Sequence, residues 1–163
     1  MYLVDSNVFI DAKNKHYAFD IVPGFWDWLD RAHHGGKVFT VQAVADEVIA
    51  GGDDLSAWMK SRPVSFRLPP DQHDQDSLAR LSQLMVGDTR YEPAAVSTFL
   101  GLADYFLVGQ GHARGWKVVT HETPGLPSRK RVKIPDACRA MGVACMSPFA
   151  MLRAESARFH LST

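Results

Sequence analysis

The sequence has few cysteines, no excess of either charge and no long apolar run. Its two cysteines, Cys138 and Cys145, are too few for a disulfide scaffold or a Cys-rich zinc site. Both lie in an apolar C-terminal stretch, so we expect them to be reduced core residues. No apolar run approaches the ~18 residues of a membrane span, and no signal-type segment opens the chain. These absences predict a cytoplasmic protein that does not enter the membrane.

The charge balance limits how the protein can bind nucleic acid. Lys plus Arg and Asp plus Glu both number 18, so the formal net charge is zero. No global field attracts a polyanion, and nucleic-acid binding would require a local basic patch. With 163 residues, 46% hydrophobic and 22% charged, the chain has ordinary globular composition, and we expect one domain over residues 1–163.

Short apolar runs alternate with helical patterns along the chain. The runs typical of buried strands are residues 2–5, 37–41, 115–120 and 143–146, and 63–68 is expected to be extended. Helices are predicted over about 20–33, 42–50, 54–60, 76–85, 94–111 and 136–141, and a first helical segment starts at Asn7. This alternation predicts an α/β fold, a three-layer α/β/α domain with a central parallel sheet of about four to five strands.

Asp5 directly follows the first apolar run. In a parallel sheet this position lies at the carboxyl edge, where ligands and metals collect. An alternative is that Asp5 or Ser6 only caps the helix that begins at Asn7. The residues around Asp5 leave both interpretations open.

Asp104 and Glu47 are acids with apolar helical neighbours. In the predicted 94–111 helix, Asp104 would lie beside Leu100, Leu107 and Val108, where an isolated carboxylate is costly. A metal, or an Arg distant in sequence, would relieve that cost. Glu47 lies a turn into the helix after the second strand, and its neighbour Asp46 competes for the same role.

Two further acids follow the third strand run. Glu122 comes two residues after Thr120, so it should leave the same sheet edge as Asp5. Thr120 could contact a ligand or simply end its strand. Asp136 follows Pro135 and is first a helix-start residue, with a place in the acidic site as the second interpretation.

Several carboxylates with almost no His or Cys partners favour a hard cation over zinc. Mg²⁺ and Mn²⁺ take oxygen ligands. Phosphodiester cleavage is the reaction suited to such a site, because the ion activates water and stabilises the leaving oxygen.

Four segments together resemble a PIN domain. They are Tyr2-Leu3-Val4-Asp5-Ser6-Asn7, Glu47 after the second strand, Ala103-Asp104 and Val119-Thr120-His121-Glu122. The resemblance covers nearly the whole chain in order and spacing. The stretches around Ala103–Phe106 and Lys133–Asp136 further resemble a PIN subfamily catalogued mainly as a domain of unknown function.

The resemblance implies a Mg²⁺- or Mn²⁺-dependent endoribonuclease, most often the toxin of a prokaryotic toxin–antitoxin pair. Asp5, Glu47 and Asp104 match the three strongest acidic positions of the family, and Glu122 falls where many members have Asp. Ser6 would contact a metal-bound water or a phosphate, and Asn7 would support the site. The implied partners are an RNA substrate and a cognate antitoxin protein, with a homodimer as a further expectation.

A basic run lies close to where this site should open. Its members could contact an RNA backbone, or form a solvated loop; they are Arg129, Lys130, Arg131 and Lys133. Aromatic residues could stack bases but are as typical of a core or a protein interface; the candidates are Tyr17, Trp26, Trp28 and Tyr91.

Three competing functions are considered. A phospho-accepting receiver domain needs paired acids after the first strand and a Lys after the last, and the sequence has neither. A DxD-type phosphohydrolase needs a second Asp where Asn7 stands. A PIN-like protein with weak or no catalysis, acting through protein or RNA binding, is the remaining alternative.

Overall fold

Parallel strands form the centre of the computed structural model, which describes residues 1–124 and 128–159. The strands are β1 (Tyr2–Val4), β2 (Val38–Val41), β3 (Arg67–Leu68), β4 (Lys117–Val119) and β5 (Cys145–Met146). Their order in the sheet is β3-β2-β1-β4-β5, and every neighbouring pair is parallel. The first strand of the chain is therefore the middle strand of the sheet.

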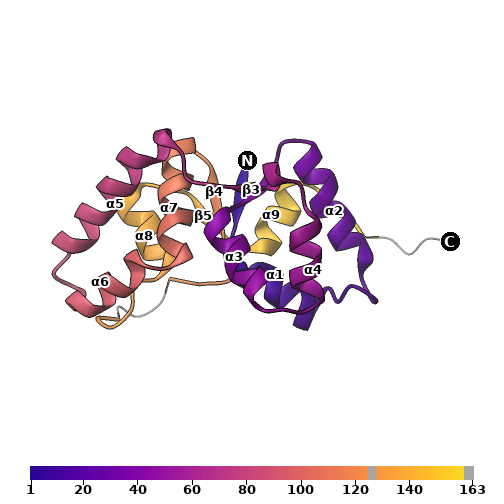
Figure 1. Ribbon diagram of the computed structural model, residues 1–163, viewed down its shortest axis with the longest axis horizontal. Coiled ribbons are helices and arrows are strands. Elements are labelled where there is room, and N and C mark those ends of the chain that lie inside the picture. The colour runs from indigo at the N-terminus through magenta and orange to yellow at the C-terminus, as the bar shows by residue number, and fades with distance from the viewer. Residues whose placement is uncertain (125–127, 160–163) are drawn as a thin grey trace.

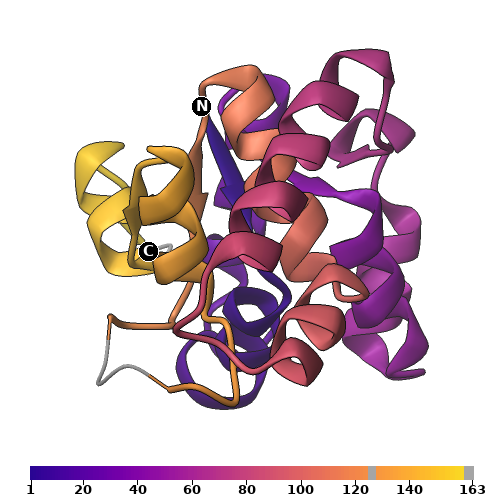
Figure 2. The same ribbon diagram turned by 90° about the vertical axis from the view of Figure 1, so that its left-hand side faces the viewer.

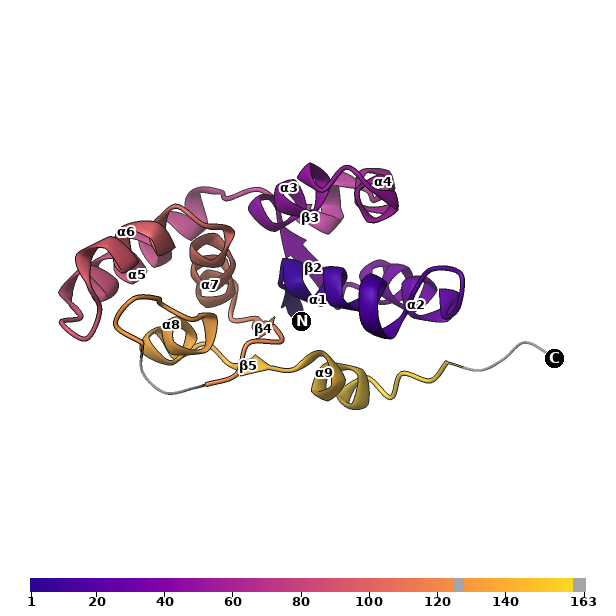
Figure 3. The ribbon, with the colours of Figure 1, turned by 90° about the horizontal axis from the view of Figure 1, so that it is seen from below.

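Helices cover both faces of this sheet. The α-helices are α1 (Ser6–Asp11), α2 (Pro23–His34), α3 (Gln42–Ala50), α4 (Asp54–Ser61), α5 (Gln75–Gly87), α6 (Pro93–Leu100), α7 (Ala103–Arg114), α8 (Ile134–Met141) and α9 (Pro148–Ala154). Figure 3 shows α5, α6, α7 and α8 on one side of the strands, and α1, α2 and α9 on the other. This three-layer arrangement confirms the predicted α/β/α fold with a parallel sheet.

The apolar residues of β1 suit the middle of the sheet. Leu3 and Val4 are fully buried there, because helices cover both faces of the strand. Leu3 is in register with Phe39 of β2 and Val118 of β4. The buried Thr40 hydroxyl donates a hydrogen bond of 2.7 Å to the carbonyl of Val4, which ties the end of β1 to β2.

The carboxyl ends of the strands meet at one edge of the molecule. In Figure 1 β1 runs downward from the labelled N-terminus towards α1, so this edge lies at the bottom of the view. Figure 2 shows the orange segment that follows β4 at the same lower edge. Polar residues that end strands β1 and β4 are thereby brought to one place.

The predicted helix over 94–111 is wrong, because the structure has two helices there. α6 ends at Leu100, and α7 begins at Ala103. Between them Leu102 is extended, with φ −98° and ψ 163°, and its side chain is 42% exposed. The two helices look like one in the sequence, because each buries an apolar face and the helical spacing of apolar residues continues across the break. Asp104 is consequently in the first turn of α7, and Leu100 belongs to the other helix.

The other predicted elements match more closely. The helix over 42–50 coincides with α3, and the expected strands and remaining helices agree within a few residues. The stretch 63–68 contains a 3₁₀ turn, η2 (Val64–Phe66), before β3. A π-helical turn, η1 (Ala12–His16), extends α1, and α9 has no counterpart in the prediction.

Two expectations about composition can be compared with the structure. Cys138 and Cys145 are both free; Cys138 is buried and Cys145 is half-buried. None of the helices in the described ranges combines the length and apolar character needed to span a bilayer.

Gly115 provides a test of how α7 is joined to β4. It ends α7 in the left-handed conformation, with φ +64°. A Gly115→Ala variant should lose about 1 kcal/mol in the free energy of unfolding, because an L side chain is strained there. Gly87→Ala is the matched control: Gly87 ends α5 without a positive φ and has open space around its Cα, so the change should be neutral or slightly stabilising. Urea unfolding measures both, and equal effects would contradict the account.

Candidate acidic site at the carboxyl edge of the sheet

Asp5 is a buried carboxylate fixed between the two central strands. Its side chain is 1% exposed, and its backbone N–H donates to the carbonyl of Val119, at 3.0 Å. The Thr120 hydroxyl donates a hydrogen bond of 2.8 Å to Asp5 Oδ2. Asp5 occupies the N-cap position of α1, but its side chain makes no capping hydrogen bond. Asp5 therefore stands where a helix cap would stand, but capping does not explain why this position carries a carboxylate.

The pKa of Asp5 is raised to about 6, chiefly by burial, with a smaller contribution from the charges of Glu122 and Glu47. The hydrogen bond from Thr120 and the adjacent Ser6 N–H act in the opposite direction. No residue of the described ranges forms an ion pair with Asp5. Its negative charge is thus uncompensated.

Asp104 is a half-buried carboxylate in the first turn of α7. Its pKa is raised to about 7, chiefly by partial burial and then by the charges of Asp5, Glu122 and Glu47. The positive charge of Arg131 lowers the pKa but does not cancel these effects. Arg131 is therefore the distant arginine that the sequence left open, and it does not form an ion pair with Asp104.

The structure distinguishes Glu47 from Asp46. Both are exposed residues of α3. The charge of Glu47 raises the pKa of both Asp5 and Asp104, whereas Asp46 accepts a hydrogen bond of 2.7 Å from Gln42 Nε2. Glu47 is accordingly the α3 acid whose charge acts on both Asp5 and Asp104.

Glu122 also lies near the pair, but its own oxygens are engaged. Oε1 accepts a hydrogen bond from Arg131, and Oε2 accepts one of 2.8 Å from the backbone N–H of Ile134. Ile134 is the first residue of α8, so Glu122 satisfies an N–H group that the helix leaves unpaired. This carboxylate connects the end of β4 to the start of α8.

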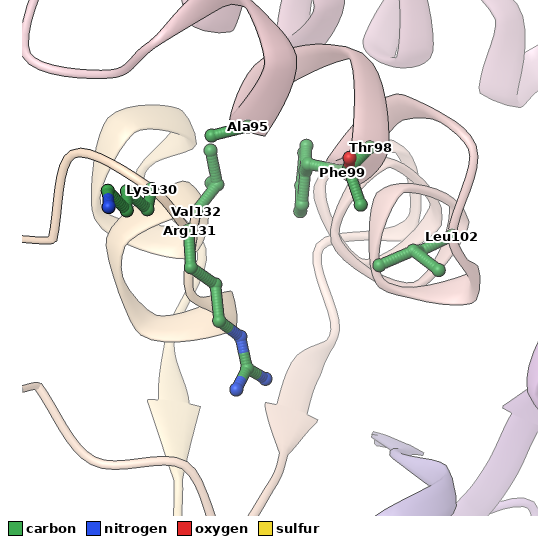
Figure 4. A pocket seen from close by; sticks show the side chains of 7 residues that line it. All are labelled: Ala95, Thr98, Phe99, Leu102, Lys130, Arg131 and Val132. Carbon is green, nitrogen blue, oxygen red and sulfur yellow. The ribbon is translucent and has the colours of Figure 1, made fainter.

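The basic run lies in the segment between Glu122 and α8. Arg129, Lys130 and Arg131 are exposed, and Lys133 is half-buried at the N-cap position of α8. Figure 4 shows Lys130 and Arg131 on one side of a cavity of about 210 Å³, with α6 residues and Leu102 on the other. Arg131 is the member of the basic run that binds Glu122 and acts on Asp104, so it joins the run to the acidic site.

The remaining predicted site residues differ in their distance from Asp5. Ser6 is buried next to it, and its hydroxyl lies 3.4 Å from Asp5 Oδ1. Asn7 is exposed on α1. Asp136 pairs with Arg139 at 3.2 Å, and its charge acts on Tyr91 and Arg90. The structure does not bring Asp136 into the group around Asp5.

His121, between Thr120 and Glu122, makes its ring contacts outside the acidic group. Burial lowers the pKa of His121, and the charges of His16 and Lys15 also lower it, while the charge of Asp11 acts in the opposite direction. The His121 ring contacts His16 and Phe149, which come from distant parts of the chain. No periodic pattern connects these three residues. Trp26, by contrast, is buried and donates to the carbonyl of Tyr17, as a core residue does.

The donor set suits a hard cation, although no complete coordination shell is formed by protein alone. Within residues 1–124 and 128–159, no three His, Cys, Asp or Glu side chains are arranged to hold a metal ion. Mg²⁺ usually takes one or two carboxylates and completes its shell with water and substrate phosphate. The buried Asp5 and the half-buried Asp104, neither of which has an ion-pair partner in the described ranges, fit that mode.

A family model covers almost the whole chain. It matches residues 2–159 and is described as a domain of unknown function, DUF4411. This chain belongs to the DUF4411 family. No curated protein and no solved structure matched it. The match confirms the resemblance to a family of unknown function, while the relation of this DUF4411 protein to PIN domains stays a prediction.

The raised pKa values of this DUF4411 protein predict an unusual pH dependence. Asp5 and Asp104 bind protons more tightly when folded than when unfolded, so their contribution to stability is full below about pH 4 and is lost as the pH rises towards 7. An Asp104→Asn variant should therefore be more stable than the parent at pH 8, by about 2 kcal/mol, and the difference should shrink at pH 5.

Urea unfolding at both pH values, with chelator present, measures this difference. Asp76→Asn is the control, because Asp76 is exposed on α5, and it should change little at either pH. An Asp104→Asn variant that is less stable than the parent at pH 8 would show that a protein partner already compensates this carboxylate.

Proposed function

We propose that this protein is a Mg²⁺- or Mn²⁺-dependent endoribonuclease. The observation that carries the proposal is the pairing of a buried carboxylate, Asp5, with a half-buried one, Asp104: neither has an ion-pair partner in the described ranges, and the charge of Asp5 raises the pKa of Asp104. Energetically costly placement of two acidic groups with raised pKa values side by side is typical of a functional site. A bound divalent cation would offset their repulsion.

Asp5 and Asp104 would hold the ion, with Glu47 at the exposed side of the site. When bound, the ion would lower the pKa of a water molecule and stabilise charge on a phosphoryl oxygen. Thr120 donates to Asp5 Oδ2, and the Ser6 hydroxyl donates a long hydrogen bond of 3.4 Å to Asp5 Oδ1, so a cation bound at Oδ1 would share that oxygen with Ser6. Ser6, beside that second oxygen, is suited to contact water or phosphate.

The charges around the site support a polyanionic substrate. Arg129 and Lys130 are exposed in the segment held by Glu122, and Lys133 lies where that segment enters α8. Side chains of this kind contact phosphates without reading sequence. In this proposal Glu122 orients the segment through Ile134 and Arg131, and it also adds negative potential to the site.

The likeness to PIN domains extends the proposal to biological role. We infer a toxin of a toxin–antitoxin pair, acting in the cytoplasm and neutralised by a cognate antitoxin protein, with a homodimer as a further expectation. Growth arrest on expression, relieved by a small neighbouring gene product, would support this role. Normal growth at high expression would contradict it.

A second candidate is a PIN-like protein with weak or no catalysis that acts by binding RNA or protein. It is favoured by the state of Glu122, whose two oxygens are both engaged within the protein. The two candidates differ in whether purified protein cleaves RNA.

A cleavage assay with single-stranded RNA and Mn²⁺ or Mg²⁺ tests the proposal. Asp5→Asn and Asp104→Asn should each reduce the rate about 100-fold or more, because each removes a charged ligand of the ion. Asp76→Asn should cleave at the parental rate. Chelator should abolish cleavage, and added metal should restore it.

Two results would contradict the nuclease. One is a parent protein that cleaves no RNA with either metal. The other is cleavage that persists unchanged in both Asp5→Asn and Asp104→Asn, which would indicate a contaminating enzyme or another site. RNA binding without cleavage would select the second candidate.

A further inference from the structure

Three aromatic rings form a partly exposed cluster outside the core. His16 ends η1, His121 follows β4 and Phe149 lies in the first turn of α9. The ring centroids are 5.8 Å apart for His16 and His121, 5.7 Å for His16 and Phe149, and 6.4 Å for His121 and Phe149. We call these three residues the aromatic trio.

The aromatic trio is partly open to solvent. His16 is exposed, Phe149 is 39% exposed and His121 is half-buried. The neighbouring Tyr17 instead stacks on the buried Phe25, with centroids 4.4 Å apart. Exposed, mutually tilted rings leave aromatic faces free for a further planar group.

Chain connectivity places the aromatic trio beside the acidic site. His121 lies between Thr120, which is bonded to Asp5, and Glu122. η1 continues the helix that starts directly after Asp5. α9 follows β5, the neighbour of β4 in the sheet. Figures 1 and 3 agree that α1 and α9 lie side by side. All three rings therefore stand at the carboxyl edge, on the α1 and α9 side.

Basic side chains flank the trio. Lys15 precedes His16, and its side chain is 62% exposed while it pairs with Asp11 at 2.9 Å. Arg153 is exposed and lies one helical turn after Phe149 on α9, so the two share a helix face. Cations beside open aromatic rings suit a ligand that carries both a planar base and a phosphate.

We propose that the aromatic trio of His16, His121 and Phe149 is a stacking site for an unpaired nucleobase of the RNA that enters the acidic site. The inference rests on the proposed nuclease function and gives its substrate a class: single-stranded RNA, with a base held on the α1 and α9 side of the site. Stacking does not require a particular base, since every base has an aromatic face. The basic run, on the opposite side near α8, would contact the continuing backbone.

Binding measurements on a cleavage-deficient protein test the stacking site. In the full-length Asp104→Asn background, fluorescence anisotropy compares a labelled 12-nucleotide oligoadenylate with an abasic ribose-phosphate chain of equal length. The parent background should bind the base-containing chain about 10-fold more tightly. Adding Phe149→Ala or His16→Ala should remove most of this preference, while affinity for the abasic chain stays unchanged.

Two further variants separate stacking from other effects. Phe149→Leu keeps apolar volume without an aromatic ring, so it should lose the preference as Phe149→Ala does. Trp116→Ala is the matched control, because Trp116 is a half-buried aromatic residue at the opposite end of β4, and it should keep the preference. The slope of affinity against salt should be the same in all variants, since phosphate contacts are untouched.

The inference is overturned if the parent background binds both chains equally or binds neither. It is also overturned if Phe149→Ala and His16→Ala keep the preference, or weaken both chains to the same extent. These outcomes do not depend on cleavage. A protein that shows the base preference but never cleaves RNA would instead contradict the proposed nuclease while leaving the stacking site in place.

Discussion

The burial of the Asp5 carboxylate between β1 and β4 is the constraint on which the rest of the site depends. Asp5 follows the middle strand of the sheet, and its carboxylate is buried away from solvent. The hydrogen bond from Thr120 fixes one oxygen but supplies no positive charge. Each further acid brought near this position, first Asp104 and then Glu47 and Glu122, increases the electrostatic cost. A bound cation would offset this repulsion, so the same acids that destabilise the empty site would favour binding of the ion.

Glu122 and Arg131 connect that acidic centre to the surface expected to meet a substrate. Their ion pair and the Glu122–Ile134 hydrogen bond hold the segment before α8 against the end of β4. The same arginine lowers the pKa of Asp104, so it moderates the repulsion that the acids create. The positive segment and the negative site are thus parts of one electrostatic arrangement, with the aromatic trio on the other side of the sheet.

Local patterns predicted the fold, and they predicted less of how the segments around Asp5 contact one another. The boundaries of α3 could be predicted because paired glycines follow it, and Gly52 has a φ of +71°. The break between α6 and α7 could not, since apolar spacing persists across Leu102. Asp5 was recognisable from its position after a buried strand. The engagement of Glu122 and the meeting of His16 with Phe149 depend on contacts between distant segments, and no local pattern encodes them.

Calorimetric titration with Mn²⁺ at pH 6.5, in two buffers of different ionisation enthalpy, tests the central claim most directly. Because the pKa values of Asp5 and Asp104 are raised to about 6 and about 7, these groups should be partly protonated at that pH. The account predicts that Mn²⁺ binds the parent protein and releases about one proton. It also predicts that Asp104→Asn binds the ion at least ~10-fold more weakly. Mn²⁺ binding that is absent from the parent, or identical in parent and variant, would contradict it.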